Sequence, residues 1–221
     1  MKKQNLTISN CKKSDLLLYA ITNRFWLQEQ SLAHDVEIAL KNGVTMLQLR
    51  EKDLPDANFM IEAQEIKKLC NKYHVPFIIN DNVNLAIACD SDGVHIGQSD
   101  LNVEIARAKL GPNKIIGVSA HTVEQAIIAE KQGADYLGVG AVFPTSTKKT
   151  ATSLPLKTLK DICNTVSIPV CAIGGISTKN IDKLIGTGID GISVISAIFG
   201  ASNIAKACNE LVELSKKVVQ R

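Results

Sequence analysis

Residues 122–140, TVEQAIIAEKQGADYLGVG, contain the unit that decides the fold. Apolar residues recur at helical spacing over Val123–Lys131, and Thr122 precedes them as an N-cap. Gly133 then stands where a left-handed helix end is expected. Tyr136–Gly140 is almost continuously apolar, as in a parallel strand that is buried on both faces. The stretch therefore predicts a helix followed directly by a parallel strand.

The same joint between helix and strand occurs elsewhere in the chain. Gly43 and Gly188 repeat the position of Gly133, while Ser31 and Thr178 repeat the N-cap position. The pattern predicts strands over Leu16–Ile21, Thr45–Leu49, Val75–Asn80, Gly93–Ile96, Ile115–Ser119, Tyr136–Gly140, Ile168–Ile173 and Gly191–Ile195. It predicts helices over Ala33–Lys41, Ala57–Asn71, Val83–Ala88, Val103–Leu110, Val123–Lys131, Leu156–Asn164, Lys179–Ile185 and Asn203–Lys217.

Eight such units predict an α/β fold, a single (β/α)8 TIM barrel over residues 15–221, after a polar segment at residues 1–14. The alternative is an open doubly wound sheet. Against it, no G-x-G-x-x-G motif follows the first strand, and no linker or shift in composition divides the chain.

The composition limits the classes of partner. A net charge of +3 argues against a broad nucleic-acid interface. The six cysteines form no C-x-x-C motif and predict reduced thiols in a cytoplasmic protein. The polar N-terminus lacks the apolar core of a signal peptide, and no apolar stretch is long enough to span a membrane.

The active site of such a barrel lies at the carboxyl ends of its strands. At the end of the second predicted strand, alternation puts Gln48, Arg50 and Lys52 on one side, which favours an anion clamp. A solvated basic edge is the alternative for this stretch.

Two carboxylates follow the third and fourth predicted strands. Asp81 and Asp100 suit Mg²⁺ that carries a polyphosphate, because Mg²⁺ prefers a few carboxylates together with substrate oxygens. Helix capping is the alternative for each. His121, after the fifth strand, is interpreted as a partly exposed residue beside Thr122, and His95 as structural.

The sixth strand is followed by FPTSTKKT, residues 143–150, whose hydroxyls and Lys148 either bind a ligand or form a plain polar loop. Gly174 and Gly175 follow the seventh strand, and Ile195-Ser196 follows the eighth. Loops at these two strands commonly bind phosphate in this fold. The pattern therefore indicates two anion sites and two phosphorylated ligands, held side by side.

Taken in order, these motifs resemble the thiamine-phosphate synthase family, from about Leu18 to Phe199. They are Gln48-Leu49-Arg50-Glu51-Lys52, Asn80-Asp81, Gly97-Gln98-Ser99-Asp100, Gly117-Val118-Ser119-Ala120-His121, Pro144-Thr145-Ser146-Thr147-Lys148, Ile173-Gly174-Gly175-Ile176 and Val194-Ile195-Ser196-Ala197. The resemblance implies a Mg²⁺-dependent transferase of thiamine biosynthesis. In that reaction a pyrimidine diphosphate loses pyrophosphate to form a carbocation, which the nitrogen of a thiazole phosphate, plain or carboxylated, captures.

The resemblance also implies roles for individual residues. Asp81 and Asp100 would hold one Mg²⁺, and Arg50, Lys52, Ser119 and Lys148 would act in catalysis. The pyrimidine diphosphate would bind Gln48, Leu49, Arg50, Glu51, Lys52, Asn80, Ser119 and Lys148. The thiazole phosphate would bind Thr145, Ser146, Thr147, Gly175, Ile195 and Ser196.

Three other functions compete with this one. They are a thiazole tautomerase, a Schiff-base aldolase and a non-catalytic sensor of phosphorylated ligands. A homodimer is expected from the resemblance alone.

Overall fold

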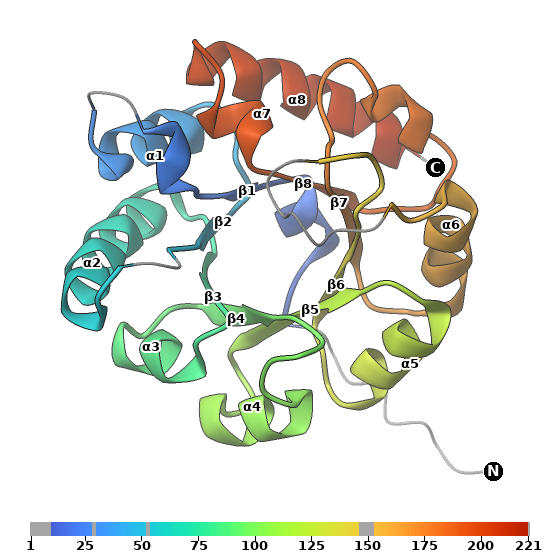
Figure 1. Cartoon of the computed structure of the whole chain (residues 1–221), viewed down its shortest axis with the longest axis horizontal. Coiled ribbons are helices and arrows are strands. Elements are labelled where there is room, and N and C mark those ends of the chain that lie inside the picture. The colour runs from blue at the N-terminus through green and yellow to red at the C-terminus, as the bar shows by residue number, and fades with distance from the viewer. Residues whose placement is uncertain (1–9, 28–29, 52–53, 146–152, 221) are drawn as a thin grey trace.

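The computed structural model describes residues 10–27, 30–51, 54–145 and 153–220. Within them, eight parallel strands follow one another around a closed barrel, and the last strand pairs with the first (Figure 1). The strands are β1 (Leu18–Ile21), β2 (Met46–Leu49), β3 (Phe77–Asn80), β4 (Gly93–Ile96), β5 (Ile115–Ala120), β6 (Tyr136–Gly140), β7 (Val170–Ile173) and β8 (Gly191–Val194). The predicted (β/α)8 barrel is confirmed, and the open sheet is excluded.

Helices surround the barrel (Figure 1). The α-helices are α1 (Leu32–Lys41), α2 (Asp56–Tyr73), α3 (Val83–Ala88), α4 (Val103–Leu110), α5 (Val123–Lys131), α6 (Leu156–Thr165), α7 (Ser196–Phe199) and α8 (Ile204–Val219). Short 3-10 helices are η1 (Lys13–Leu16), η2 (Arg24–Trp26) and η3 (Ile181–Leu184). None of the helices in the described ranges is both long and apolar enough to cross a membrane.

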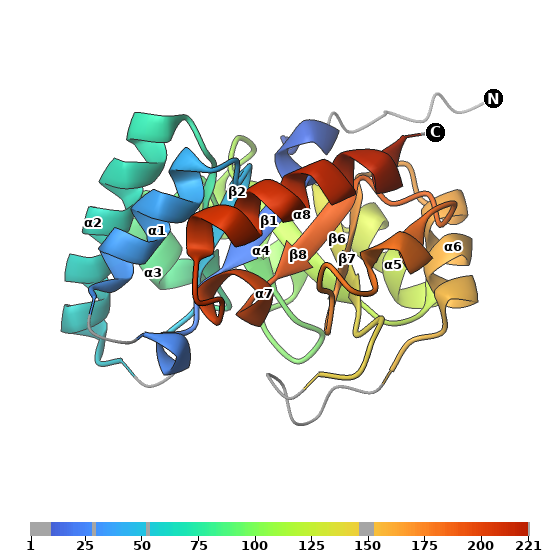
Figure 2. The same cartoon turned by 90° about the horizontal axis from the view of Figure 1, so that it is seen from above.

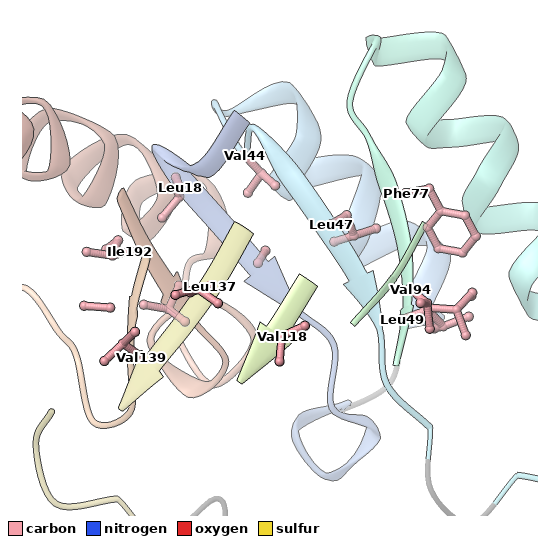
Figure 3. Packing of buried hydrophobic residues seen from close by; sticks show 14 of the residues in the cluster. Leu18, Val44, Leu47, Leu49, Phe77, Val94, Val118, Leu137, Val139 and Ile192 are labelled. Carbon is pink, nitrogen blue, oxygen red and sulfur yellow. The ribbon is translucent and has the colours of Figure 1, made fainter. Parts of the chain in front are cut away.

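Strand residues alternate between two hydrophobic cores. Residues such as Leu47 and Leu137 point outward and pack under the helices (Figure 3). Their neighbours in sequence, Met46 and Tyr136, belong to a second cluster inside the barrel. Because both faces of every strand are buried, the strands are apolar almost throughout, which is the pattern that the sequence presents.

The amino end of the barrel is closed by the segment before β1. Cys11 and Leu16 pack with the residues that fill the barrel, and Asn10 donates its backbone N–H to the Asp135 carboxylate at 2.8 Å. Figure 2 places η1 at one end of the barrel and α7 at the other. The domain boundary at residue 15 stays a prediction, since residues 1–9 lie outside the described ranges.

Two of the corrections to the predicted elements concern the seventh helix and the first strand. The helix predicted at Lys179–Ile185 is only the 3-10 helix η3, and Thr178 does not cap it. Instead Asn180 ties this turn back, because its Oδ1 accepts from the Ser177 N–H and its Nδ2 donates to the Gly175 carbonyl. The first strand begins at Leu18, because Leu16 belongs to η1 in the barrel floor.

Candidate active site

A cavity of about 390 Å³ opens at the carboxyl ends of the strands. It is lined by eight of the residues predicted from the sequence: Gln48, Arg50, Asn80, Ser119, Thr145, Gly175, Ile195 and Ser196. The closed barrel therefore brings members of both predicted subsites to one cavity. Lys52, Ser146, Thr147 and Lys148 lie outside the described residues.

The residues at the end of β2 and just after it lie in two different environments. Gln48 and Arg50 line the cavity, whereas Leu49 is buried in the outer core. Glu51 also lies away from the cavity lining, where its carboxylate accepts from Arg24 Nε at 2.9 Å. Burial raises the pKa of the Glu51 carboxyl, and the neighbouring Arg24 opposes that rise. In the described part of the chain, the Arg50 guanidinium makes no ion pair and is available to an anion.

The two carboxylates lie in the loops after the neighbouring strands β3 and β4, and neither is among the residues that line the cavity. Asp81 has a left-handed backbone with φ of 60°, and its Oδ2 accepts from Asn80 Nδ2 at 2.6 Å. Asp100 Oδ2 accepts from the Gly97 N–H at 2.6 Å. Neither caps a helix, because Asn82 caps α3 and Asn102 caps α4. The capping alternative is therefore wrong for both residues.

The glycine pair after β7 makes room for the loop after β6. A Cβ on Gly175 would lie 2.3 Å from the Pro144 carbonyl oxygen, and one on Gly174 would lie 2.4 Å from Ala141 Cβ. The Phe143 N–H donates to the Gly174 carbonyl at 3.0 Å. These contacts fix the start of the loop that carries Thr145 into the cavity lining.

The end of β8 supplies a hydroxyl that the sequence analysis missed. Ser193 lines the cavity and is 2% exposed, and its Oγ has no hydrogen-bond partner among the described residues. The strand ends at Val194, so Ile195 is the N-cap of the unpredicted helix α7 rather than a strand residue. A short extra helix after strand 8 commonly forms part of the phosphate site in this fold.

We expect Ser193→Ala to stabilise the free protein by about 1 kcal/mol, because a buried hydroxyl without a partner costs free energy in the folded state. Urea unfolding of both proteins measures the change. A Ser215→Ala variant is the matched control, since Ser215 Oγ is also buried with no hydrogen-bond partner in the described ranges but lies in α8. A loss of stability in Ser193→Ala would contradict the assignment of an unpartnered hydroxyl.

Two histidines also line the cavity. His121 Nδ1 lies 2.5 Å from the Gly140 carbonyl oxygen, and Thr122 caps α5 as predicted. His95 reaches the cavity from β4, where Val94 and Ile96 point to the outer core. Alternation along this strand was a signal in the sequence that His95 faces inward.

Comparisons with known proteins agree with this fold and with the resemblance found in the sequence. Residues 18–198 match the family described as thiamine monophosphate synthase. A thiamine-phosphate synthase of Clostridium tetani is 49% identical over 90% of this chain and 96% of its own, and one of Clostridium acetobutylicum is 48% identical over 93% and 98%. A solved thiamine phosphate pyrophosphorylase of Pyrococcus furiosus is 40% identical, with a TM-score of 0.86 over 94% of this chain and 99% of its own.

More distant structures share the barrel alone. They include a 3-hexulose-6-phosphate synthase at 18% identity, with a TM-score of 0.63 over 90% of this chain and 99% of its own. The match to thiamine-phosphate synthases, in contrast, is high in identity and extends over nearly the whole barrel. It supports a transferase that acts in the synthesis of thiamine phosphate. The chain belongs to the thiamine monophosphate synthase family.

Proposed function

We propose that the cavity binds the pyrimidine diphosphate and the thiazole phosphate together and joins them into thiamine phosphate with release of pyrophosphate. The observation that carries this proposal is one cavity lined by residues of both predicted subsites. Gln48, Arg50, Asn80 and Ser119 belong to the pyrimidine end. Thr145, Gly175, Ile195 and Ser196 belong to the thiazole end, and the buried Ser193 hydroxyl is available beside them.

The diphosphate would lie at the β2 to β4 side of the cavity. Arg50 supplies a cation that is not engaged by a carboxylate there, and a guanidinium suits phosphate oxygens because it can donate two parallel hydrogen bonds. Lys52 and Lys148 are proposed as further cations, although both lie outside the described residues.

Asp81 and Asp100 would hold a magnesium ion at the same side. Within the described ranges no group of three or more His, Cys, Asp or Glu side chains could hold a metal ion. Two carboxylates completed by diphosphate oxygens and water fit Mg²⁺, which rarely occupies an all-protein cage. When bound, Mg²⁺ would neutralise the charge that develops on the departing diphosphate.

In the proposed chemistry the protein positions the two substrates and stabilises the charge that develops on the diphosphate. The bond between the pyrimidine methylene carbon and the diphosphate oxygen breaks, the electron pair leaves with pyrophosphate, and the thiazole nitrogen donates a pair to the cation. Two hydroxyl-bearing loops hold the thiazole phosphate, so that its nitrogen faces the reacting carbon. The chemistry also predicts that a loop keeps water from the cation, and residues 143–150 are the candidate for it. Residues 146–150 lie outside the described residues, so this stays a prediction.

Other functions fit the cavity less well. Ser119 Oγ contacts His95 Nε2, and His95 Nδ1 contacts the Tyr136 hydroxyl, whereas a hydrolytic triad has a carboxylate at this second nitrogen. Among the described residues no lysine lines the cavity, which argues against a Schiff-base aldolase. The carboxylates and Arg50 favour the synthase over a tautomerase, which needs no diphosphate site.

The decisive experiment mixes both substrates with the purified protein and Mg²⁺, then repeats the mixture with excess EDTA. We expect thiamine phosphate and pyrophosphate in equal amounts, loss of both products with EDTA, and recovery when Mg²⁺ is restored. Absence of Mg²⁺-dependent thiamine phosphate would overturn the proposed function. A cytoplasmic location and a homodimer are further proposals, which rest on membership of the family.

A further inference from the structure

A line of hydrogen-bonded side chains crosses the inside of the barrel beneath the cavity. Gln48 Nε2 donates to the Tyr19 hydroxyl, which lies 2.8 Å from the Tyr136 hydroxyl. His95 Nδ1 lies 2.9 Å from the Tyr136 hydroxyl, and His95 Nε2 lies 3.0 Å from Ser119 Oγ. The line therefore begins at one cavity residue, on β2, and ends at another, on β5.

The middle of this line is beyond the reach of a ligand. Tyr19 and Tyr136 are 1% and 0% exposed, and neither lines the cavity. The interior of such a barrel is usually filled by branched apolar side chains, which bury no polar atoms. Two buried phenols need hydrogen bonds to offset their desolvation, so this arrangement calls for a reason beyond filling space.

Neighbouring strands leave room for the line. A Cβ on Gly117 would lie 2.0 Å from Tyr136 Cζ, and a Cβ on Gly138 would lie 3.1 Å from His95 Cε1. Both glycines have ordinary negative φ values, so backbone conformation does not require them. Their small size gives the two rings the space that they occupy.

The line has a direction. We infer it from the contact in which Gln48 Nε2 donates to the Tyr19 oxygen: every hydroxyl of the line then has an acceptor when Tyr19 donates to Tyr136 and Tyr136 donates to His95 Nδ1. A neutral imidazole that accepts at Nδ1 carries its proton on Nε2 and donates it to Ser119 Oγ. Burial raises the pKa of both phenols, which keeps them protonated and able to donate.

This direction determines which hydrogen-bonding groups Gln48 and Ser119, at the two ends of the line, present to a ligand. With its amide nitrogen engaged, Gln48 presents its amide oxygen as an acceptor. With its oxygen accepting from His95, Ser119 presents its own proton as a donor. An aminopyrimidine is complementary to this pair, because it carries an amino donor beside a ring-nitrogen acceptor.

We propose that Tyr19, Tyr136 and His95 are positioning residues that hold Gln48 as an acceptor and Ser119 as a donor, and so select an amino-substituted pyrimidine ring. The assignment of the ring rests on the proposed function. The hydrogen-bond direction rests on the contacts alone and is tested separately.

Tyr136→Phe breaks the line at its centre and keeps the ring that fills the space. We expect the KM for the pyrimidine diphosphate to rise about 10-fold, the equivalent of one net hydrogen bond, while the KM for the thiazole phosphate changes less than about two-fold. Tyr73→Phe is the matched control, because its hydroxyl contacts Glu37 away from the cavity. Equal KM changes for both substrates, or none, would overturn the proposal.

Nitrogen-15 NMR of the four histidines tests the direction of the line without turnover. Wild-type His95 is expected as the tautomer protonated on Nε2, and Tyr136→Phe is expected to change its Nδ1 signal while Tyr73→Phe leaves it unchanged. Protonation on Nδ1 in the wild type would overturn the proposal. If the wild type makes no thiamine phosphate but has the expected tautomer and response, the proposed function fails and the hydrogen-bond line stands.

Discussion

Asp81→Asn is expected to lower kcat by about 10²- to 10³-fold, the scale of losing one main electrostatic contribution to the transition state. Asparagine suits this test because Asp81 has a φ of 60°, and asparagine tolerates the left-handed region better than alanine does. The variant therefore removes a negative charge while keeping the backbone. Thiamine phosphate formation at saturating substrates, measured across a Mg²⁺ titration, gives the effect.

A control for this variant is Asp161→Asn, which removes an exposed carboxylate paired with Lys157 on α6. It is expected to leave turnover and the Mg²⁺ dependence unchanged. Wild-type turnover by Asp81→Asn over the whole Mg²⁺ range would remove Asp81 from the proposed metal site. Urea unfolding of both variants separates a lost charge from a lost fold.

Arg50→Gln is expected to reduce kcat/KM for the pyrimidine diphosphate by about 10²-fold, because charge-assisted hydrogen bonds contribute about 1.5–3 kcal/mol each. The free energy of unfolding is expected to change by less than about 0.5 kcal/mol. The reason is that the Arg50 guanidinium has no ion pair in the described part of the chain, and the Arg50 backbone N–H, which donates to Thr22 Oγ1, is retained. Steady-state kinetics and urea unfolding measure the two quantities.

Arg24→Gln is the matched control and is expected to have the opposite profile. Arg24 pairs with Glu51 and Glu62 and does not line the cavity, so its loss leaves the buried Glu51 carboxylate without its cation. Stability is expected to fall while the KM for the pyrimidine diphosphate stays near its wild-type value. If Arg24→Gln raised that KM as much as Arg50→Gln does, the effect of Arg50→Gln would come from the loss of positive charge near the cavity and not from a contact of the Arg50 guanidinium.

Much of the fold was predictable because its signals are local. The spacing of apolar residues in Val123–Lys131, the N-cap Thr122 and the glycine at 133 each act within one or two turns of chain. The helix predicted at Lys179–Ile185 was wrong because Asn180 contacts Ser177 and Gly175, and these contacts form a turn that the helical pattern does not reveal. Helix α7 was missed because four residues are too few to give a helical period.

The sequence by itself determined the eight units, the order of the loops at the barrel mouth and the family, since short-range patterns and motifs carry all of these. Only the tertiary structure decided which side chains meet inside the barrel. Gln48 and Ser119 lie on β2 and β5, and their link passes through Tyr19, Tyr136 and His95 on three other strands. Closure of the barrel brings these strands around one axis, and no local pattern encodes that contact.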